Sequence, residues 1–322
     1  MFQRSEGVES TLSITFLIGL IAATLRVATP LVYATLGEVF TERSGILNLG
    51  IEGIMFLGAF VGFAAAYKAN EVGLAAYLWI GLFSAILVGI LMGLLMGFFS
   101  VTLGVNQHVS GLGITLLCTG LSLLGFRIVF GERSVLPSID PFVQLSPFKG
   151  VPVLGDIASQ YLLTYIAFLI VVPLSWWLLF RTSFGLNLRS VGENPEAVDA
   201  AGLNVFRIRY LVLALGGGLM ATGGVFLSLA QLGAFTPGII AGRGWVCIAL
   251  VIFARWHPVR AALSALLFGG VFALQLRLQT FGFKLPFEIF LALPYLVTIA
   301  ALALSSRHVS YPGAYLKPYQ RE

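Results

Sequence analysis

Long apolar stretches separated by short polar connections dominate this sequence. Asp, Glu, Lys and Arg are absent between Glu71 and Arg127, Asp156 and Arg181, Arg209 and Arg243, and Glu288 and Arg307. Each gap is long enough for a helix to cross a bilayer, which takes roughly 20 apolar residues. The pattern predicts spans at about 51–67, 75–99, 108–130, 160–180, 210–230, 244–255, 261–279 and 288–305. Because these runs are continuously apolar and not alternating, they indicate helices and not β-barrel strands.

The N-terminal part admits two interpretations. Residues 11–50 read either as one long span with a re-entrant segment or as two spans broken near Pro30. If Arg4 is cytoplasmic, two spans are needed, which gives ten crossings. The first apolar run lacks a basic leader and a cleavage site, so we expect a retained span. The predicted fold is an all-α polytopic membrane protein of about ten transmembrane helices, with a broken or re-entrant segment near 37–53.

Composition and charge agree with a single transmembrane domain over 1–322. The chain is 58% hydrophobic and 10% charged, so we expect its main solvent to be lipid. Four arginines occur in 181–209, which predicts that the loop 182–209 is cytoplasmic, and alternation then makes the loop 131–159 extracytoplasmic. The net charge of +5 is spread over the ends of apolar runs, so nucleic acid is not an expected partner.

Polar residues interrupt the apolar pattern between Gly37 and Gly53, where the sequence reads GEVFTERSGILNLGIEG. Charges at membrane depth cost about 3 kcal/mol or more each, so they line water, pair or mark a pathway. The glycines fit a broken helix beside a cavity, and the alternative is a polar cytoplasmic turn. For the other polar positions the alternative is an ordinary helix cap. The candidate pathway residues are Asn48, Glu52, Asn106, Gln107 and Gln231.

The segment GENPEAVDAAGLN at 192–204 predicts a short helix outside the membrane. Asn194 suits the cap, Pro195 the first turn, Glu196 the positive helix end and Gly202 the terminus. So short a helix is marginal alone, so we expect it to dock on another surface, either a partner or its own bundle. The candidate docking residues are Asn194, Pro195, Glu196, Asp199, Ala200, Ala201 and Gly202.

Motifs for chemistry are missing from the sequence. None of the four lysines is followed by Ser or Thr, so there is no phosphate-binding GxxxxGK[ST] loop. There is no nucleophile elbow and no HExxH, and the two cysteines and three histidines lack metal-ligand spacing. We therefore assign no catalytic residue, no metal and no cofactor to this chain. If ATP drives it, another chain hydrolyses the ATP.

Several stretches together resemble one known family. They are ERSGILNLGIEGIMFLGAF at 42–60, VNQHVSGLGITLL at 105–117, SVGENPEAVDAAGLNV at 190–205, AGRGWVCIALVIFARWHPVRAALSALLFG at 241–269 and LPYLVTIAALAL at 293–304. The chain resembles the branched-chain-amino-acid, ribose and nucleoside class of ABC importer permeases. It is most similar to nucleoside permeases that work with a basic-membrane-protein-type lipoprotein receptor. Thr115, Ala254 and His257 depart from the family pattern, which bears on the identity of the solute.

The resemblance implies a complex in a bacterial or archaeal cell membrane. It implies about ten helices per subunit, a second permease that is identical or homologous, two cytoplasmic ABC ATPases that use ATP and Mg, and an extracytoplasmic substrate-binding lipoprotein. On this analogy the helix at 194–202 is the coupling helix that contacts the ATPase, and nucleosides enter by alternating access. Two alternatives stay open: a permease for simple sugars such as ribose or galactose, and an ion-coupled secondary transporter, which predicts inverted repeats.

Overall fold

Membrane-spanning helices make up most of the computed structural model. It describes residues 2–131, 135–148, 150–151, 153–280, 292–294, 296–297, 299–300, 303 and 310–319, with side chains from residue 15 onward. Seven helices in these ranges are long and apolar enough to cross a membrane: Thr15–Arg43, Ile51–Glu71, Tyr77–Thr102, Gln107–Phe130, Leu162–Arg181, Val205–Leu232 and Pro258–Gln279. The predicted all-α polytopic fold is confirmed. The predicted span at 288–305 lies largely outside the described residues.

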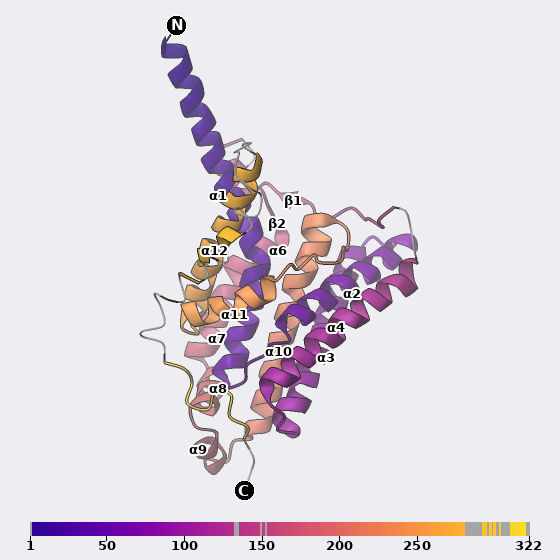
Figure 1. The fold of residues 1–322 in the computed structure, drawn as a ribbon, viewed down its shortest axis with the longest axis vertical. Helices are drawn as coiled ribbons and strands as arrows, with labels where there is room; N and C mark the ends of the chain where they lie inside the picture. The colour runs from indigo at the N-terminus through magenta and orange to yellow at the C-terminus, as the bar shows by residue number, and fades with distance from the viewer. Residues whose placement is uncertain are drawn as a thin grey trace.

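The first span is a single helix. α1 (Phe2–Arg43) continues through Pro30, so the interpretation of two spans broken at that proline is wrong. The chain instead breaks at 44–50, within the predicted segment, and α2 (Ile51–Glu71) follows. Gly45 has a φ of +88°, a left-handed conformation that ends helices and suits glycine. The start of α1, which contains Arg4, lies at the opposite end of the molecule from α9 (Figure 1). The interpretation with two N-terminal spans required Arg4 and α9 to lie on the same side of the membrane.

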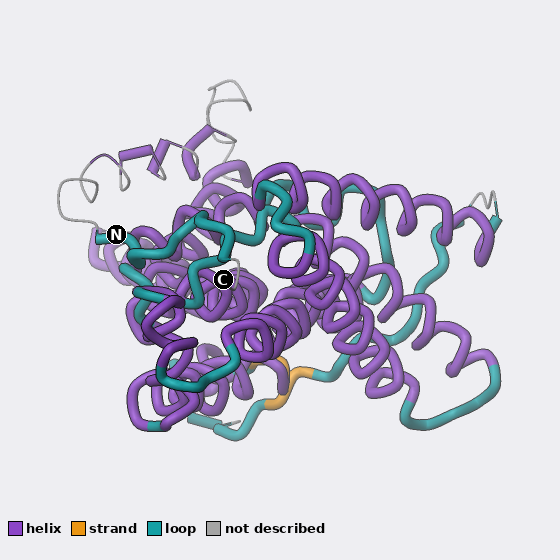
Figure 2. The backbone as a smooth tube through the Cα atoms, turned by 90° about the horizontal axis from the view of Figure 1, so that it is seen from below, coloured by secondary structure: helices purple, strands orange, loops and turns teal. Residues whose placement is uncertain are grey.

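The middle of the chain adds three spans and an irregular connection. α3 (Tyr77–Gly97) continues as η1 (Phe98–Thr102), and α4 (Gln107–Phe130) follows. The connection contains β1 (Gln144–Leu145), α5 (Leu154–Ala158) and β2 (Gln160–Tyr161), with Gln144 opposite Tyr161 in an antiparallel pair. This pair lies at the edge of the helix bundle (Figure 2). The next span comprises α6 (Leu162–Tyr165), η2 (Ile166–Val171) and α7 (Val172–Arg181).

One helix, α10 (Val205–Val225), continued by η3 (Phe226–Leu232), forms the centre of the bundle and packs against α1, α2 and α3. Small residues allow backbones to touch there, as is typical of helix packing in membranes. A Cβ on Gly224 would lie 1.8 Å from the carbonyl oxygen of Met55. A Cβ on Gly217 would lie 2.1 Å from the carbonyl oxygen of Gly89. The core of this protein is therefore built by contact between main chains as much as by side chains.

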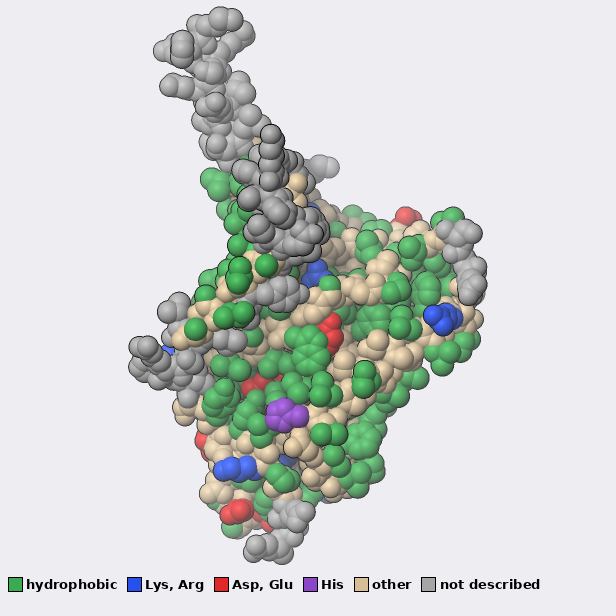
Figure 3. Space-filling model, in the orientation of Figure 1, with side chains coloured by type: hydrophobic (Ala, Val, Ile, Leu, Met, Phe, Trp, Pro, Cys, Tyr) green, Lys and Arg blue, Asp and Glu red, His purple; other side chains and the backbone are tan. Residues whose placement is uncertain are grey.

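The remaining helices complete one end and one side of the bundle. α8 (Ser183–Glu193) and α9 (Pro195–Ala200) lie at the same end as the C-terminal segment 310–319 (Figure 1). α11 (Arg243–Ala254) occupies the predicted span 244–255 but is only 12 residues long, too short to cross a bilayer. α12 (Pro258–Thr280) follows it. Hydrophobic side chains cover much of the described surface visible in Figure 3.

Candidate functional site

The segment predicted to dock on a partner forms α9, and its local structure is as expected. Asn194 Oδ1 accepts a hydrogen bond from the backbone N–H of Ala197 at 3.0 Å, and Pro195 occupies the first turn. Glu196 is the acidic residue of that turn. Gly202 follows with a φ of +83° and donates its N–H to the Asp199 carbonyl oxygen. The helix itself ends at Ala200, two residues earlier than predicted, because the last two positions form the turn.

One buried side chain, Val198, packs α9 against the rest of the chain. Val198 is buried and packs with Val191 of α8 and Val205 of α10. The docking residues Asn194, Glu196, Ala200, Ala201 and Gly202 are exposed, whereas Pro195 and Asp199 are half-buried. Most of the predicted docking surface is therefore accessible, and it lies on a helix whose opposite face packs against α8 and α10.

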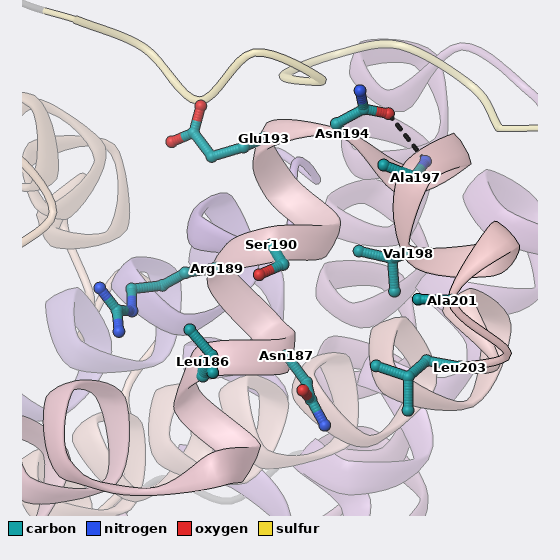
Figure 4. A pocket seen from close by; sticks show the side chains of 10 residues that line it. All are labelled: Leu186, Asn187, Arg189, Ser190, Glu193, Asn194, Ala197, Val198, Ala201 and Leu203. Atoms are coloured by element: carbon teal, nitrogen blue, oxygen red, sulfur yellow. Dashed lines mark hydrogen bonds between the residues drawn. The ribbon is translucent and has the colours of Figure 1, made fainter.

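An open groove of about 570 Å³ lies between α8 and α9. Its walls carry both apolar and polar groups, as Figure 4 shows. The lining residues are Leu186, Asn187, Arg189, Ser190, Glu193, Asn194, Ala197, Val198, Ala201 and Leu203. A groove lined by both apolar and polar groups suits a protein-binding surface.

The first residues of α10 lie inside the segment 182–209, which is predicted from the sequence to be a cytoplasmic loop. α10 begins at Val205, so Arg207 and Arg209 belong to its first turns and not to a loop. Arg209 is only 1% exposed, and its Nε donates to the Ser44 carbonyl oxygen at 3.3 Å. This arginine therefore holds α10 against the end of α1, and it is not a solvent-exposed marker of orientation.

The loop 44–50 is buried and gathers two of the predicted pathway residues. Asn48 is fully buried, its N–H donates to Glu38 Oε1 at 2.9 Å, and its Oδ1 accepts from the Gly50 N–H at 3.0 Å. Gln107 is also buried, and its Oε1 accepts from the Leu47 N–H at 2.8 Å. Both amide groups satisfy the backbone of a helix break, which must find partners where water is excluded.

Glu52, the third predicted pathway residue, caps another helix. Its Oε1 accepts from the Gly242 N–H at 2.9 Å, and its Oε2 accepts from the Gly244 N–H at 2.7 Å. Gly242 is the N-cap of α11 and Gly244 lies in its first turn, where unpaired N–H groups and the helix dipole favour an anion. Glu52 therefore joins the start of α2 to the start of α11, 190 residues away.

The other two pathway candidates lie apart from this cluster. Asn106 is exposed and caps α4, where its Oδ1 accepts the His108 N–H at 2.9 Å. Gln231 is exposed in η3, at the end of its span away from α9. The structure thus brings Asn48 and Gln107 to one loop, and it places Asn106 and Gln231 elsewhere.

A pair of buried carboxyl groups was not among the predicted site residues. Glu38 and Glu42 are both fully buried at the end of α1. Thr41 Oγ1 donates to Glu38 Oε2 at 3.0 Å, and Trp256 Nε1 donates to Glu42 Oε2 at 2.6 Å. The four-residue spacing on one helix face is the signal in the sequence that could have paired them. Trp256, the partner of Glu42, is 214 residues away along the chain, and no local pattern identifies it.

Comparisons with known proteins agree with this architecture. The family model described as branched-chain amino acid transport system, permease component, matches residues 20–302. The chain is 37% identical to TsgC13 of Haloferax volcanii, named for a glucose ABC transporter permease, over 95% of this chain and 99% of that one. It is 36% identical to the guanosine ABC transporter permease protein NupQ of Bacillus subtilis, over 93% and 96%.

A solved structure assigned to an inward-facing, metal-chelate-type ABC transporter has a similar fold. The TM-score is 0.51, with 18% sequence identity, and the match covers 90% of this chain and 87% of that one. At that identity the likeness concerns the fold alone. The family match extends over most of the chain, through α9 and the buried loop, and this chain therefore belongs to the branched-chain amino acid transport system permease family of ABC transporters.

Proposed function

We propose that this chain forms the transmembrane pathway of an ABC importer that carries nucleosides into the cytoplasm, with ATP hydrolysed by a separate ATPase subunit. The observation that carries the proposal is α9, a short capped helix whose outer face is exposed and whose only buried anchor among its described residues is Val198. A helix so short needs a partner surface for stability. Relatives named for guanosine and nucleoside transport support the choice of solute.

The contacts of α8 suggest how movement of α9 reaches the membrane. A Cβ on Gly192, near the end of α8, would lie 2.0 Å from the Arg43 carbonyl oxygen, so α8 rests directly on the end of α1. From there Gln107 connects the loop 44–50 to α4, and Glu52 connects α2 to α11. Closure of the ATPases would move α9, and these contacts would carry the movement to the helices that line the pathway.

Burial divides the candidate pathway residues into two groups. Asn48 and Gln107 are buried and already hydrogen-bonded, and Glu52 is occupied by two backbone donors, so these three brace the pathway. Asn106 and Gln231 are exposed. We propose that these two are the ones that contact the solute, one toward each end of the spans.

The exposed face of α4 suits the second permease subunit. Only 17% of the residues in an apolar 18-residue stretch of α4 are buried. A Cβ on Gly113 or Gly120 would meet nothing within 4 Å. Small residues on an open helix face allow another helix to approach closely. Pairing is also supported by a second guanosine permease protein in Bacillus subtilis, NupP, which is 25% identical to this chain. An extracytoplasmic binding protein would deliver the solute, so the permease needs no strong site of its own.

Simple sugars are the second candidate solute. The specific observation in their favour is the relative TsgC13, which is named for glucose and is 37% identical to this chain. Uptake of radiolabelled guanosine, ribose and glucose into vesicles containing the assembled transporter separates the two. Saturable, ATP-dependent uptake of guanosine alone supports the proposal. Uptake of a sugar in preference to guanosine replaces it with the second candidate.

The coupling role of α9 has its own test, the substitution Ala201→Trp. An indole on this exposed position should obstruct the ATPase without disturbing the core, so we expect normal insertion with loss of ATPase association or of solute-stimulated ATP hydrolysis. Ala75→Trp, at an exposed position of the connection between α2 and α3, is the matched control. If the Ala201→Trp complex keeps full coupled hydrolysis and uptake, α9 is not the coupling helix.

A further inference from the structure

The C-terminal segment 310–319 joins two parts of the chain that are far apart in sequence. The N–H of Ala314 donates to the Gly192 carbonyl oxygen at 2.8 Å, and the N–H of Leu316 donates to the Gly45 carbonyl oxygen at 3.1 Å. Gly313 N–H also donates to Glu193 Oε2 at 3.1 Å. The segment is thus hydrogen-bonded on one side to the end of α8 and on the other to the buried loop 44–50.

Aromatic side chains fix the same segment to the turn after α11. The ring centroids of Tyr311 and Tyr315 lie 5.1 and 6.5 Å from that of Trp256. Trp256 in turn donates to Glu42 of α1. Tyr319 lies 6.0 Å from Phe206 in the first turn of α10. Ala314, at the centre of the segment, is only 4% exposed. The segment therefore contacts the loop 44–50, the end of α8, the turn after α11 and the start of α10.

The segment also shares a surface with α9. A second groove, of about 290 Å³, lies between the start of α9 and the C-terminal segment. Its lining residues are Glu193, Asn194, Pro195, Glu196, Gly313, Ala314, Lys317, Pro318 and Tyr319. A protein that covers the exposed face of α9 would also meet Lys317 and Pro318, which are exposed.

We propose that the segment 310–319 is a positioning element for coupling, which carries the displacement of α8 and α9 to the buried loop 44–50. This inference rests on the proposed function of α9. The loop bonded to the segment contains Asn48 and is bonded to Gln107, so its movement reaches α2 and α4. The hydrogen bonds of the segment to the loop and to the end of α8 add a second connection between them, beside the direct packing of α8 on α1.

The test removes one link and leaves the rest of the chain intact. Ala314→Pro deletes the backbone N–H that donates to the Gly192 carbonyl oxygen, whereas Ala314→Ser keeps this backbone N–H and adds only a hydroxyl group to the side chain. Each variant is purified with its ATPase and second permease and reconstituted in vesicles. In Ala314→Pro we expect unchanged ATPase association but a fall of about fivefold in solute imported per ATP hydrolysed, the lower end of usual coupling energies. Ala314→Ser should keep the wild-type ratio of solute imported to ATP hydrolysed.

A second measurement covers the case in which the proline variant fails to assemble. Amide hydrogen exchange is followed in the loop 44–50 of the wild-type complex and of a chain truncated after residue 309, with and without ATP. We expect ATP to change exchange in this loop only when the segment is present. An equal change in both chains, or an unaltered import ratio in Ala314→Pro, overturns the inference while leaving α9 as the coupling helix. If Ala201→Trp also has no effect, the proposed function itself fails.

Discussion

The carboxylate of Glu52 lies 2.7 Å from the backbone nitrogen of Gly244, and this contact fixes the start of one helix on the first turn of another. A Cβ on Gly244 would lie 2.6 Å from the Glu52 Cα, so the two backbones are already as close as they can be. The position of α11 therefore depends on a glycine and on an anion. Neither can be exchanged for a similar residue without a local shift.

Glu52→Gln tests this contact. The amide keeps one oxygen acceptor but points N–H groups at an N–H donor and removes the charge at the α11 start, at a cost of about 1 kcal/mol. We expect the complex to assemble while uptake falls. Initial uptake rates over a range of solute concentrations measure the effect, and Glu71→Gln, at an exposed site, is the control. Unchanged uptake kinetics would remove Glu52 from the residues that brace the pathway.

Gly224→Ala tests the close packing of α10. The added methyl group would collide with the Met55 carbonyl oxygen, which main chains cannot easily avoid. We expect the free energy of unfolding to fall by about 1–3 kcal/mol, the usual cost of overpacking. Gly113→Ala adds the same methyl to a helix where nothing lies within 4 Å, so the isolated subunit should tolerate it. Thermal denaturation of detergent-solubilised protein compares the two, and equal midpoints would contradict the packing argument.

A cysteine at Asn204 tests the orientation of the chain. Asn204 is exposed between α9 and α10, whereas the native Cys118 and Cys247 are both buried, so background labelling should be low. We expect a membrane-impermeant maleimide to react only from the cytoplasmic side. Right-side-out and inside-out vesicles give the comparison. Reaction from the outside would reverse the orientation and place α9 out of reach of any cytoplasmic ATPase.

The stability of the protein should depend on His257 in mild acid. Burial, and then the charges of Arg260 and Arg43, lower the pKa of this imidazole, which stacks on Phe180. The unfolded chain therefore binds a proton more readily than the folded one, and stability falls as the pH drops through the unfolded pKa of about 6.5. Comparing melting temperatures at about pH 7.5 and 5.5 should give a smaller acid loss in His257→Gln than in the wild type. An equal loss in both would exclude this residue as a contributor.

Local features were the ones that the sequence could predict. Asn194, Pro195 and Gly202 act on groups within a few residues of themselves, so the caps of α9 followed from short-range rules. The spans predicted at 51–67, 75–99, 108–130, 160–180, 210–230 and 261–279 followed from uninterrupted apolar runs. The same reasoning failed for 244–255, because α11 is too short to cross a bilayer. The predicted break at Pro30 was wrong because proline usually interrupts a helix only where nothing compensates. Within a bundle, neighbouring helices can satisfy the backbone groups that the proline leaves free.

The long-range contacts could not be predicted. The bond from Glu52 to the start of α11 and the bond from Trp256 to Glu42 each join residues about two hundred positions apart. A single sequence contains no record of which polar group meets which donor. The contacts of 310–319 could not be predicted for the same reason, and its hydrogen bonds to Gly45, Gly192 and Glu193 are donated by backbone N–H groups, which carry no sequence signal. The assignment of Asn106 and Gln231 to the pathway stays a prediction.

The glycine contacts of α10 have a consequence for engineering the transporter. Where main chains touch, as at Gly217 and Gly89, any larger side chain would clash with the backbone of the neighbouring helix. Libraries intended to change solute preference should therefore leave α10 and the faces of α1, α2 and α3 that pack on it unaltered. Randomising the exposed positions Asn106 and Gln231 instead should yield a larger fraction of variants that still reach the membrane, and among them altered transport will be easier to select.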